Sequence, residues 1–79
     1  MPRYYFHLHN DMDVSDEEGM GLPDLEAARE QALENARVMA CVSIKEQGNV
    51  NLDHYIEVTD ERGEALFKLT FREAFTVTG

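Results

Sequence analysis

The chain has 79 residues, of which 16 are acidic and 7 are basic, so its formal net charge is −9. This length allows one domain with a modest core, and a hydrophobic content of 43 % excludes a disordered acidic tail. The charge argues against nucleic acid and anionic membranes as partners, because neutralising phosphates requires clustered Lys and Arg.

The first element that we predict is a strand at residues 3–9, RYYFHLH, because its aromatic-rich residues alternate with period two. One face of this strand carries Tyr4, Phe6 and Leu8, and the other carries Tyr5, His7 and His9. Turn chemistry follows, and residues 12–16 are predicted as a weak second strand. Residues 17–23 are expected to be irregular, with Gly19 and Gly21 allowing a bend.

Residues 24–47 form the longest periodic segment, and we predict one amphipathic helix there. Asp24 is a good N-cap, and Gly48 supplies the left-handed residue that ends such a helix. The buried stripe consists of Leu25, Ala28, Ala32, Ala36, Met39, Ala40 and Ser43, with Leu33 and Ile44 beside it. Because the middle of this stripe is alanine, the helix can lie close to a sheet. At about 36 Å it is longer than strands of about 20–23 Å, so one end is expected to overhang.

The C-terminal half of this helix is apolar on more than one side. Val38, Cys41 and Val42 point away from the main stripe. Two interpretations remain open at this point. Either the C-terminal tail, with Phe71 and Phe75, covers this second face, or another subunit or partner does.

After the helix, residues 54–59 and 65–70 are predicted to form a hairpin around a four-residue loop that ends in Gly63. Pairing Thr59 with Glu64 would place apolar residues opposite each other. The expected pairs are Val58 with Ala65 and Ile56 with Phe67. Residues 71–75, FREAF, are predicted to form one helical turn.

The predicted order is therefore ββαββ, and the fold class is α+β, with a small antiparallel sheet of two hairpins packed against one long helix. We expect a single domain over residues 1–79, with residues 1–2 and 76–79 loose. The predicted core consists of Phe6, Leu8, Ala32, Ala36, Met39, Ile56, Val58 and Phe67.

Several segments resemble a family of short bacterial proteins of unknown function, about 80 residues long. They are the start PRYYFHLHND, the DEEGMGLPDLEAAR approach to the helix, the IEVTDERGE hairpin and the closing FREAF. The PDLEAAR and VTDERG segments are the most specific of these. The resemblance covers nearly the whole chain and implies a compact stand-alone cytoplasmic protein. It implies no activity and no catalytic residues.

The acidic segment after the first strand begins like a calcium loop, with Asp11, Asp13 and Ser15 at positions one, three and five. The pattern then fails, because Asp16 stands where a glycine is needed and Leu22 where a glutamate is needed. We therefore expect a solvated acidic loop.

The three histidines offer an alternative, a divalent-metal site. His7 and His9 leave the same face of one strand, and His54 would join them if its strand were the neighbour. Such a set suits zinc or nickel. The competing interpretation is that these are ordinary histidines on an exposed sheet face.

No catalytic or cofactor-binding constellation is present in the sequence. Cys41, the only cysteine, excludes an intrachain disulfide and lies mid-helix, which favours a structural role. No signal-peptide run and no membrane span is seen, and we expect a cytoplasmic protein.

The sequence predicts a small acidic soluble protein that is not an enzyme and binds no cofactor, small molecule, nucleic acid or membrane. The leading hypothesis is a protein-interaction module that forms a homodimer or binds another protein through Val38, Cys41 and Val42. The alternative is a metal-binding protein that uses His7, His9 and His54, and an enzyme comes third.

Overall fold

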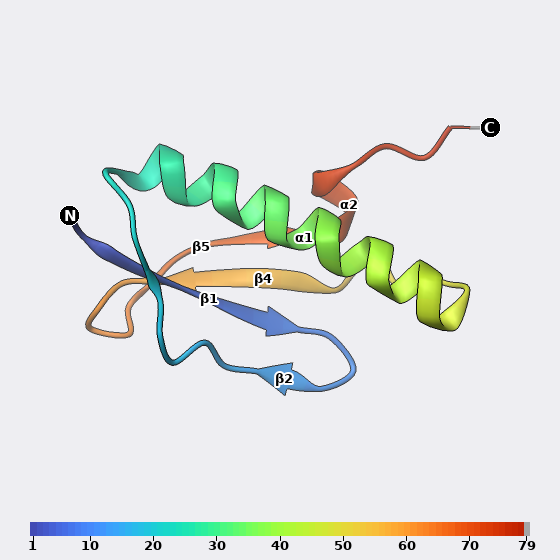
Figure 1. The fold of residues 1–79 in the computed structure, drawn as a ribbon, viewed down its shortest axis with the longest axis horizontal. Coiled ribbons are helices and arrows are strands. Elements are labelled where there is room, and N and C mark those ends of the chain that lie inside the picture. The colour runs from blue at the N-terminus through green and yellow to red at the C-terminus, as the bar shows by residue number, and fades with distance from the viewer. Residues whose placement is uncertain (79) are drawn as a thin grey trace.

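One long helix lies across one face of an antiparallel sheet in the computed structural model, which describes residues 1–78 (Figure 1). The elements follow the order β1 (Arg3–His9), β2 (Asp13–Val14), β3 (Met20–Gly21), α1 (Leu25–Gln47), β4 (Tyr55–Thr59), β5 (Ala65–Thr70) and α2 (Phe71–Ala74). This confirms the α+β class, the long helix and the helical turn after the last strand. The predicted looseness of residues 76–79 falls partly on Gly79, which lies outside the described residues.

The strands lie in the order β2-β1-β4-β5, so the two predicted hairpins meet through their first strands. β2 pairs with the end of β1, and β3 pairs with its beginning, where Tyr4 lies opposite Met20. The prediction of an irregular segment at residues 17–23 was therefore wrong at β3. The chain returns to β1 because Gly19 adopts a φ of +70°, and a Cβ at this position would come within 2.8 Å of Tyr5 Cε2.

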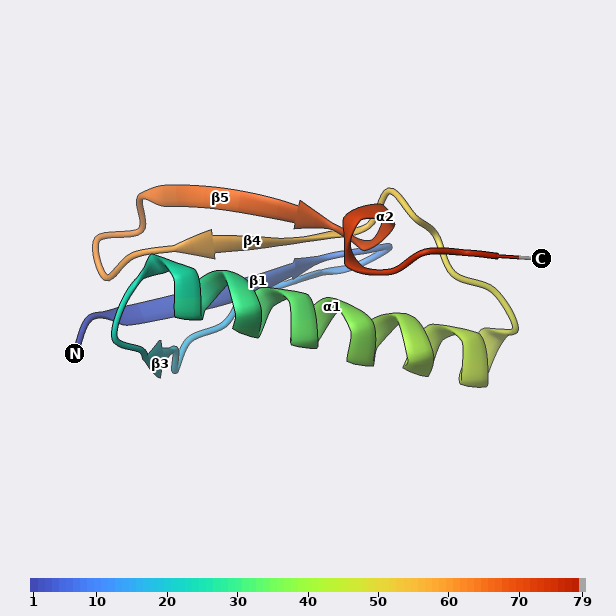
Figure 2. The ribbon, with the colours of Figure 1, turned by 90° about the horizontal axis from the view of Figure 1, so that it is seen from above.

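α1 begins and ends where the sequence predicts. The carboxylate of Asp24 accepts from the N–H of Ala27 at 2.8 Å, and the N–H of Gly48, at a φ of 74°, donates to the carbonyl of Ile44 at 2.9 Å. The side of α1 that faces the sheet carries four buried alanines, which we call the alanine stripe: Ala28, Ala32, Ala36 and Ala40. The last turns of α1 run past the ends of the strands (Figure 2).

The core lies between the alanine stripe and the sheet. Of the eight predicted core residues, five are buried: Leu8, Ala32, Ala36, Ile56 and Val58. The other three, Phe6, Met39 and Phe67, are partly buried against them. The prediction for Leu25 was wrong, since its side chain is 50 % exposed at the first turn of α1, beside Leu66 of the edge strand β5.

The β4–β5 hairpin has a different register from the one that we predicted. Thr59 pairs with Ala65 instead of Glu64, and an irregularity between Val58 and Thr59 brings Ile56 opposite Leu69 and Val58 opposite Phe67. Asp60 accounts for the first of these changes, the pairing of Thr59 with Ala65. Its carboxylate accepts from the N–H groups of Arg62 and Glu64, and its own N–H donates to the carbonyl of Glu64, which adds a residue to the turn. Gly63 has a φ of 80°, as predicted.

The first prediction tests the close contact of the alanine stripe with the sheet. Ala36 is fully buried, so Ala36→Leu should overpack the interface and lower the free energy of unfolding by about 1–3 kcal/mol in urea denaturation. The matched control is Ala65→Leu, the same exchange at an exposed alanine of β5. If both variants unfold at the same urea concentration, α1 does not lie on the sheet through this stripe.

Candidate functional site

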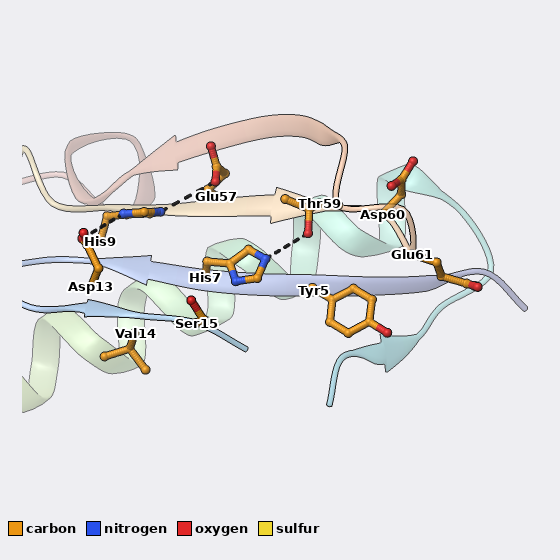
Figure 3. A pocket seen from close by; sticks show the side chains of 11 residues that line it. Tyr5, His7, His9, Asp13, Val14, Ser15, Glu57, Thr59, Asp60 and Glu61 are labelled. Atoms are coloured by element: carbon orange, nitrogen blue, oxygen red, sulfur yellow. Dashed lines mark hydrogen bonds and ion pairs between the residues drawn. The ribbon is translucent and has the colours of Figure 1, made fainter. Parts of the chain in front are cut away.

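The face of the sheet turned away from α1 is polar and carries two of the three histidines. Side chains of β1 and β4 project from it, and β2 and the β4–β5 turn border it (Figure 3). Together they form an open hollow of 420 Å³. Its lining residues are Tyr5, His7, His9, Asp13, Val14, Ser15, Glu57, Thr59, Asp60, Glu61 and Gly63. Four of these side chains are carboxylates and none is Lys or Arg.

His7 uses both ring nitrogens within the fold. The backbone N–H of Asp16 donates to its Nδ1 at 3.1 Å, and its Nε2 lies 2.9 Å from the hydroxyl of Thr59. Because a backbone N–H can only donate, Nδ1 accepts, and the proton of the neutral ring is therefore on Nε2, which donates to Thr59. In this arrangement neither nitrogen offers a lone pair to a metal ion.

His9 lies in a different environment two residues further along β1. Its Nδ1 is 3.0 Å from a carboxylate oxygen of Asp13, and its ring stacks on Tyr55 with the centroids 4.6 Å apart. Its Nε2 is buried without a hydrogen-bond partner among residues 1–78, and the nearest carboxylate oxygen, of Glu57, is 3.7 Å away. The Nε2 of His9 and the carboxylate of Glu57 are thus two candidate metal ligands at the edge of the hollow.

His54 does not join the other two histidines. β4 is indeed the neighbour of β1, but Tyr55 lies opposite His9 in the register, which places His54 on the other face of the sheet. There its ring packs edge-on against Phe71, and its Nε2 is 3.5 Å from Asp11. Among residues 1–78, no three His, Cys, Asp or Glu side chains are grouped closely enough to hold a metal ion.

The second candidate site is the apolar surface on the outside of α1, formed by Val38, Cys41 and Val42, which we call the outer patch. Val38 is 49 % exposed, Val42 is 37 % exposed, and Cys41 is a free, exposed thiol. On the side toward β1, a pit of 250 Å³ adjoins the patch, lined by Phe6, Leu8, Asn35, Val38, Met39 and Ile56. Apolar surface therefore continues from the helix into the layer between helix and sheet.

The C-terminal tail packs against α1 on its other flank. Phe71 and Ala74 of α2 are buried in the core, and the guanidinium of Arg37 donates to the carbonyl of Ala74 at 2.6 Å. In Figure 2, α2 lies beside α1 on the side of β4 and β5. The tail thus covers the flank that carries Arg37 and leaves Val38 and Val42 exposed.

Comparison with known protein families matches residues 3–72, from the start of β1 into α2, to a family described as a domain of unknown function, DUF6894. The chain belongs to this family. No curated protein and no solved structure matches it significantly. Among residues 1–78, no helix combines the length and the apolar character that crossing a membrane requires.

Within the DUF6894 match, Asp16 is a structural residue that the sequence analysis missed. One carboxylate oxygen accepts from the N–H of Phe6, and the other accepts from the N–H groups of Glu18 and Gly19, all at 3.1 Å. The loop between β2 and β3 is thereby tied to β1, so the prediction of a solvated loop was wrong at this residue. The spacing Asp-x-x-Gly, in which a carboxylate accepts from N–H groups two and three residues later, is the signal that could have found it.

These contacts change the acidity of Asp16. Burial by itself would raise the pKa of its carboxyl group. The hydrogen bonds from Gly19, Phe6 and Glu18, together with the nearby His7, outweigh that effect and lower the pKa below the ordinary value of 3.8. A lowered pKa in the folded state stabilises the fold above the pKa of the unfolded chain. This stabilisation is lost as the pH falls below about 4.

The second prediction is that Asp16→Asn destabilises the protein by about 1–3 kcal/mol at neutral pH, because the N–H of Phe6 loses its acceptor. The difference from the wild type should be smaller at about pH 2 than at neutral pH, because the stabilisation by the lowered pKa is progressively lost below about pH 4. Urea denaturation at both pH values measures it. Glu17→Gln, at the exposed neighbouring residue, is the control and should be neutral. A deficit that stays constant down to about pH 2 would contradict the role assigned to the Asp16 charge.

Proposed function

We propose that this protein is a non-enzymatic protein-interaction module that presents the outer patch of α1 to a protein partner. The observation that carries the proposal is the exposure of Val38 and Val42, 49 % and 37 %, beside a tail that is already packed on the other flank of the helix. Contiguous exposed apolar surface on a small protein commonly marks an interface.

The surroundings of the outer patch support this role. The adjoining pit is lined by Phe6 and Met39, which are only partly buried, so an apolar side chain of a partner has a recess to enter. Buried apolar anchors of this kind supply much of the binding energy of protein interfaces. The last turns of α1 also extend beyond the sheet (Figure 2), which leaves them accessible from outside.

Metal binding ranks second in this proposal. The support for it is limited to the free Nε2 of His9 and the carboxylate of Glu57, 3.7 Å apart. A zinc site takes three or four protein ligands, whereas His7 is engaged with Asp16 and Thr59 and His54 lies on the other face of the sheet.

An enzymatic role finds less support in the acidic groups. A general acid needs a raised pKa, but the pKa of Asp16 is lowered, and so is that of Asp60, chiefly by the hydrogen bond from the N–H of Glu64. We further propose a bacterial, cytoplasmic setting. An exposed free thiol such as Cys41 is typical of a reducing compartment.

The third prediction uses Cys41 as a natural attachment point within the patch. A thiol-directed photo-crosslinker on Cys41 should give adducts with a protein, either another copy or a different chain, in host-cell extract. The same reagent on a Cys41→Ser, Glu17→Cys variant should give no such adducts. Residue 17 is also exposed, but it lies on the β2–β3 loop and not in the outer patch. Gel electrophoresis and mass spectrometry detect the adducts.

Val42→Glu and Leu66→Glu form a matched pair for this experiment, because their side chains are 37 % and 38 % exposed on α1 and β5. Val42→Glu should remain folded and lose the Cys41 adducts, because it places a charge in the apolar patch. Leu66→Glu should keep them. Equal adducts from the wild type and Val42→Glu, or none from the wild type, would refute the proposed function.

A further inference from the structure

The outside of α1 carries a regular seam that runs through the outer patch. Ala27, Gln31, Glu34, Val38, Cys41 and Lys45 follow one another with spacings of four, three, four, three and four residues. Residues with this spacing fall on one line along a helix. In coiled coils two helices pack along such a line where its residues are apolar, as Val38 and Cys41 are here. From Glu34 to Lys45, every seam residue is exposed.

The charges on this seam are arranged with opposite signs on either side of its apolar centre. Glu34 precedes Val38 and Cys41, and Lys45 follows them. The two charges are eleven positions apart, about 16 Å along the helix, so they cannot pair within one chain. Neither forms an ion pair with any other group among residues 1–78.

We propose that two copies of this chain pair through the seams of their α1 helices in antiparallel orientation. This proposal rests on the proposed function and identifies the protein partner as a second copy of the chain. The pair Glu34 and Lys45 and the pair Val38 and Cys41 share one midpoint, between Met39 and Ala40. A two-fold axis there places Glu34 of each copy opposite Lys45 of the other. It also places Val38 opposite Cys41 and brings the two Val42 side chains to the flanks of the contact.

The opposite orientation is disfavoured by the same charges. Parallel helices in register would bring Glu34 against Glu34 and Lys45 against Lys45, and like charges across an interface cost binding energy. The small side chains of Val38 and Cys41 allow the close interaxial distances of packed helices, 8–10 Å. The two-fold arrangement is closed, so it stops at a dimer.

The test exchanges the charges. Glu34→Lys and Lys45→Glu each place like charges opposite each other twice per dimer, and each should raise the dissociation constant about tenfold, measured by analytical ultracentrifugation. The double variant Glu34→Lys, Lys45→Glu keeps the composition and net charge of the wild type and should restore the affinity to within about threefold. Glu17→Lys, the same charge change at an exposed loop residue, should not weaken the dimer.

A mixing experiment makes the readout specific to contacts between chains. An equimolar mixture of Glu34→Lys and Lys45→Glu should form heterodimers in native mass spectrometry, because each variant then presents the charge that complements the other. Far-ultraviolet circular dichroism checks that α1 remains folded in each variant.

The possible outcomes separate this inference from the proposed function. The antiparallel pairing is overturned if the wild type is monomeric at high micromolar concentration. It is also overturned if the charge exchanges leave the dissociation constant of the dimer unchanged. Cys41 adducts that contain a different protein would then leave the proposed function standing. A monomer without any Cys41 adduct would overturn both.

Discussion

The close contact between the alanine stripe and the sheet is the constraint on which the rest of the structure depends. Four alanines at intervals of four residues are 0–3 % exposed, so the backbone of α1 itself lies against the strands. Because these side chains are short, much of the core volume comes from the sheet and from α2, through Leu69, Phe71 and Val58. The larger apolar residues of α1 are then left on its flanks and its outer side.

Within residues 1–78, this arrangement leaves two surfaces without a covering layer. On the polar face of the sheet, His7 is hydrogen-bonded to the hydroxyl of Thr59 and to the backbone N–H of Asp16, and the carboxylate of Asp16 accepts from the N–H of Phe6. On the outside of α1, Val38 and Val42 are apolar and exposed, so they cannot be satisfied by hydrogen bonds within the fold. The difference between these two surfaces is the physical reason for proposing the helix, and not the histidines, as the functional surface.

The sequence predicted those parts of the fold that depend on local chemistry. Asp24 and Gly48 limit α1 as expected because N-caps and left-handed C-terminal residues act within one turn. The faces of β1 followed from period two. The register of β4 and β5 did not follow from apolar matching, because the carboxylate of Asp60 sets the length of the turn. The separation of His54 from His7 and His9 depends on which residue of β4 pairs with His9, which is a contact between distant segments.

The sequence predicted which residues form the outer patch, but whether they are exposed depended on the position of the C-terminal tail. The tail is held by the contact of Arg37 with Ala74, a contact between distant segments that no local sequence pattern predicts.

The most direct test of the antiparallel pairing is an isotope-filtered nuclear Overhauser experiment on a mixture of labelled and unlabelled chains. Antiparallel pairing of the two seams predicts cross-peaks between the Val38 methyl groups of one copy and the Cys41 β-protons of the other. Contacts between copies that involve β5 or the polar sheet face instead, or no contacts at all, would contradict it.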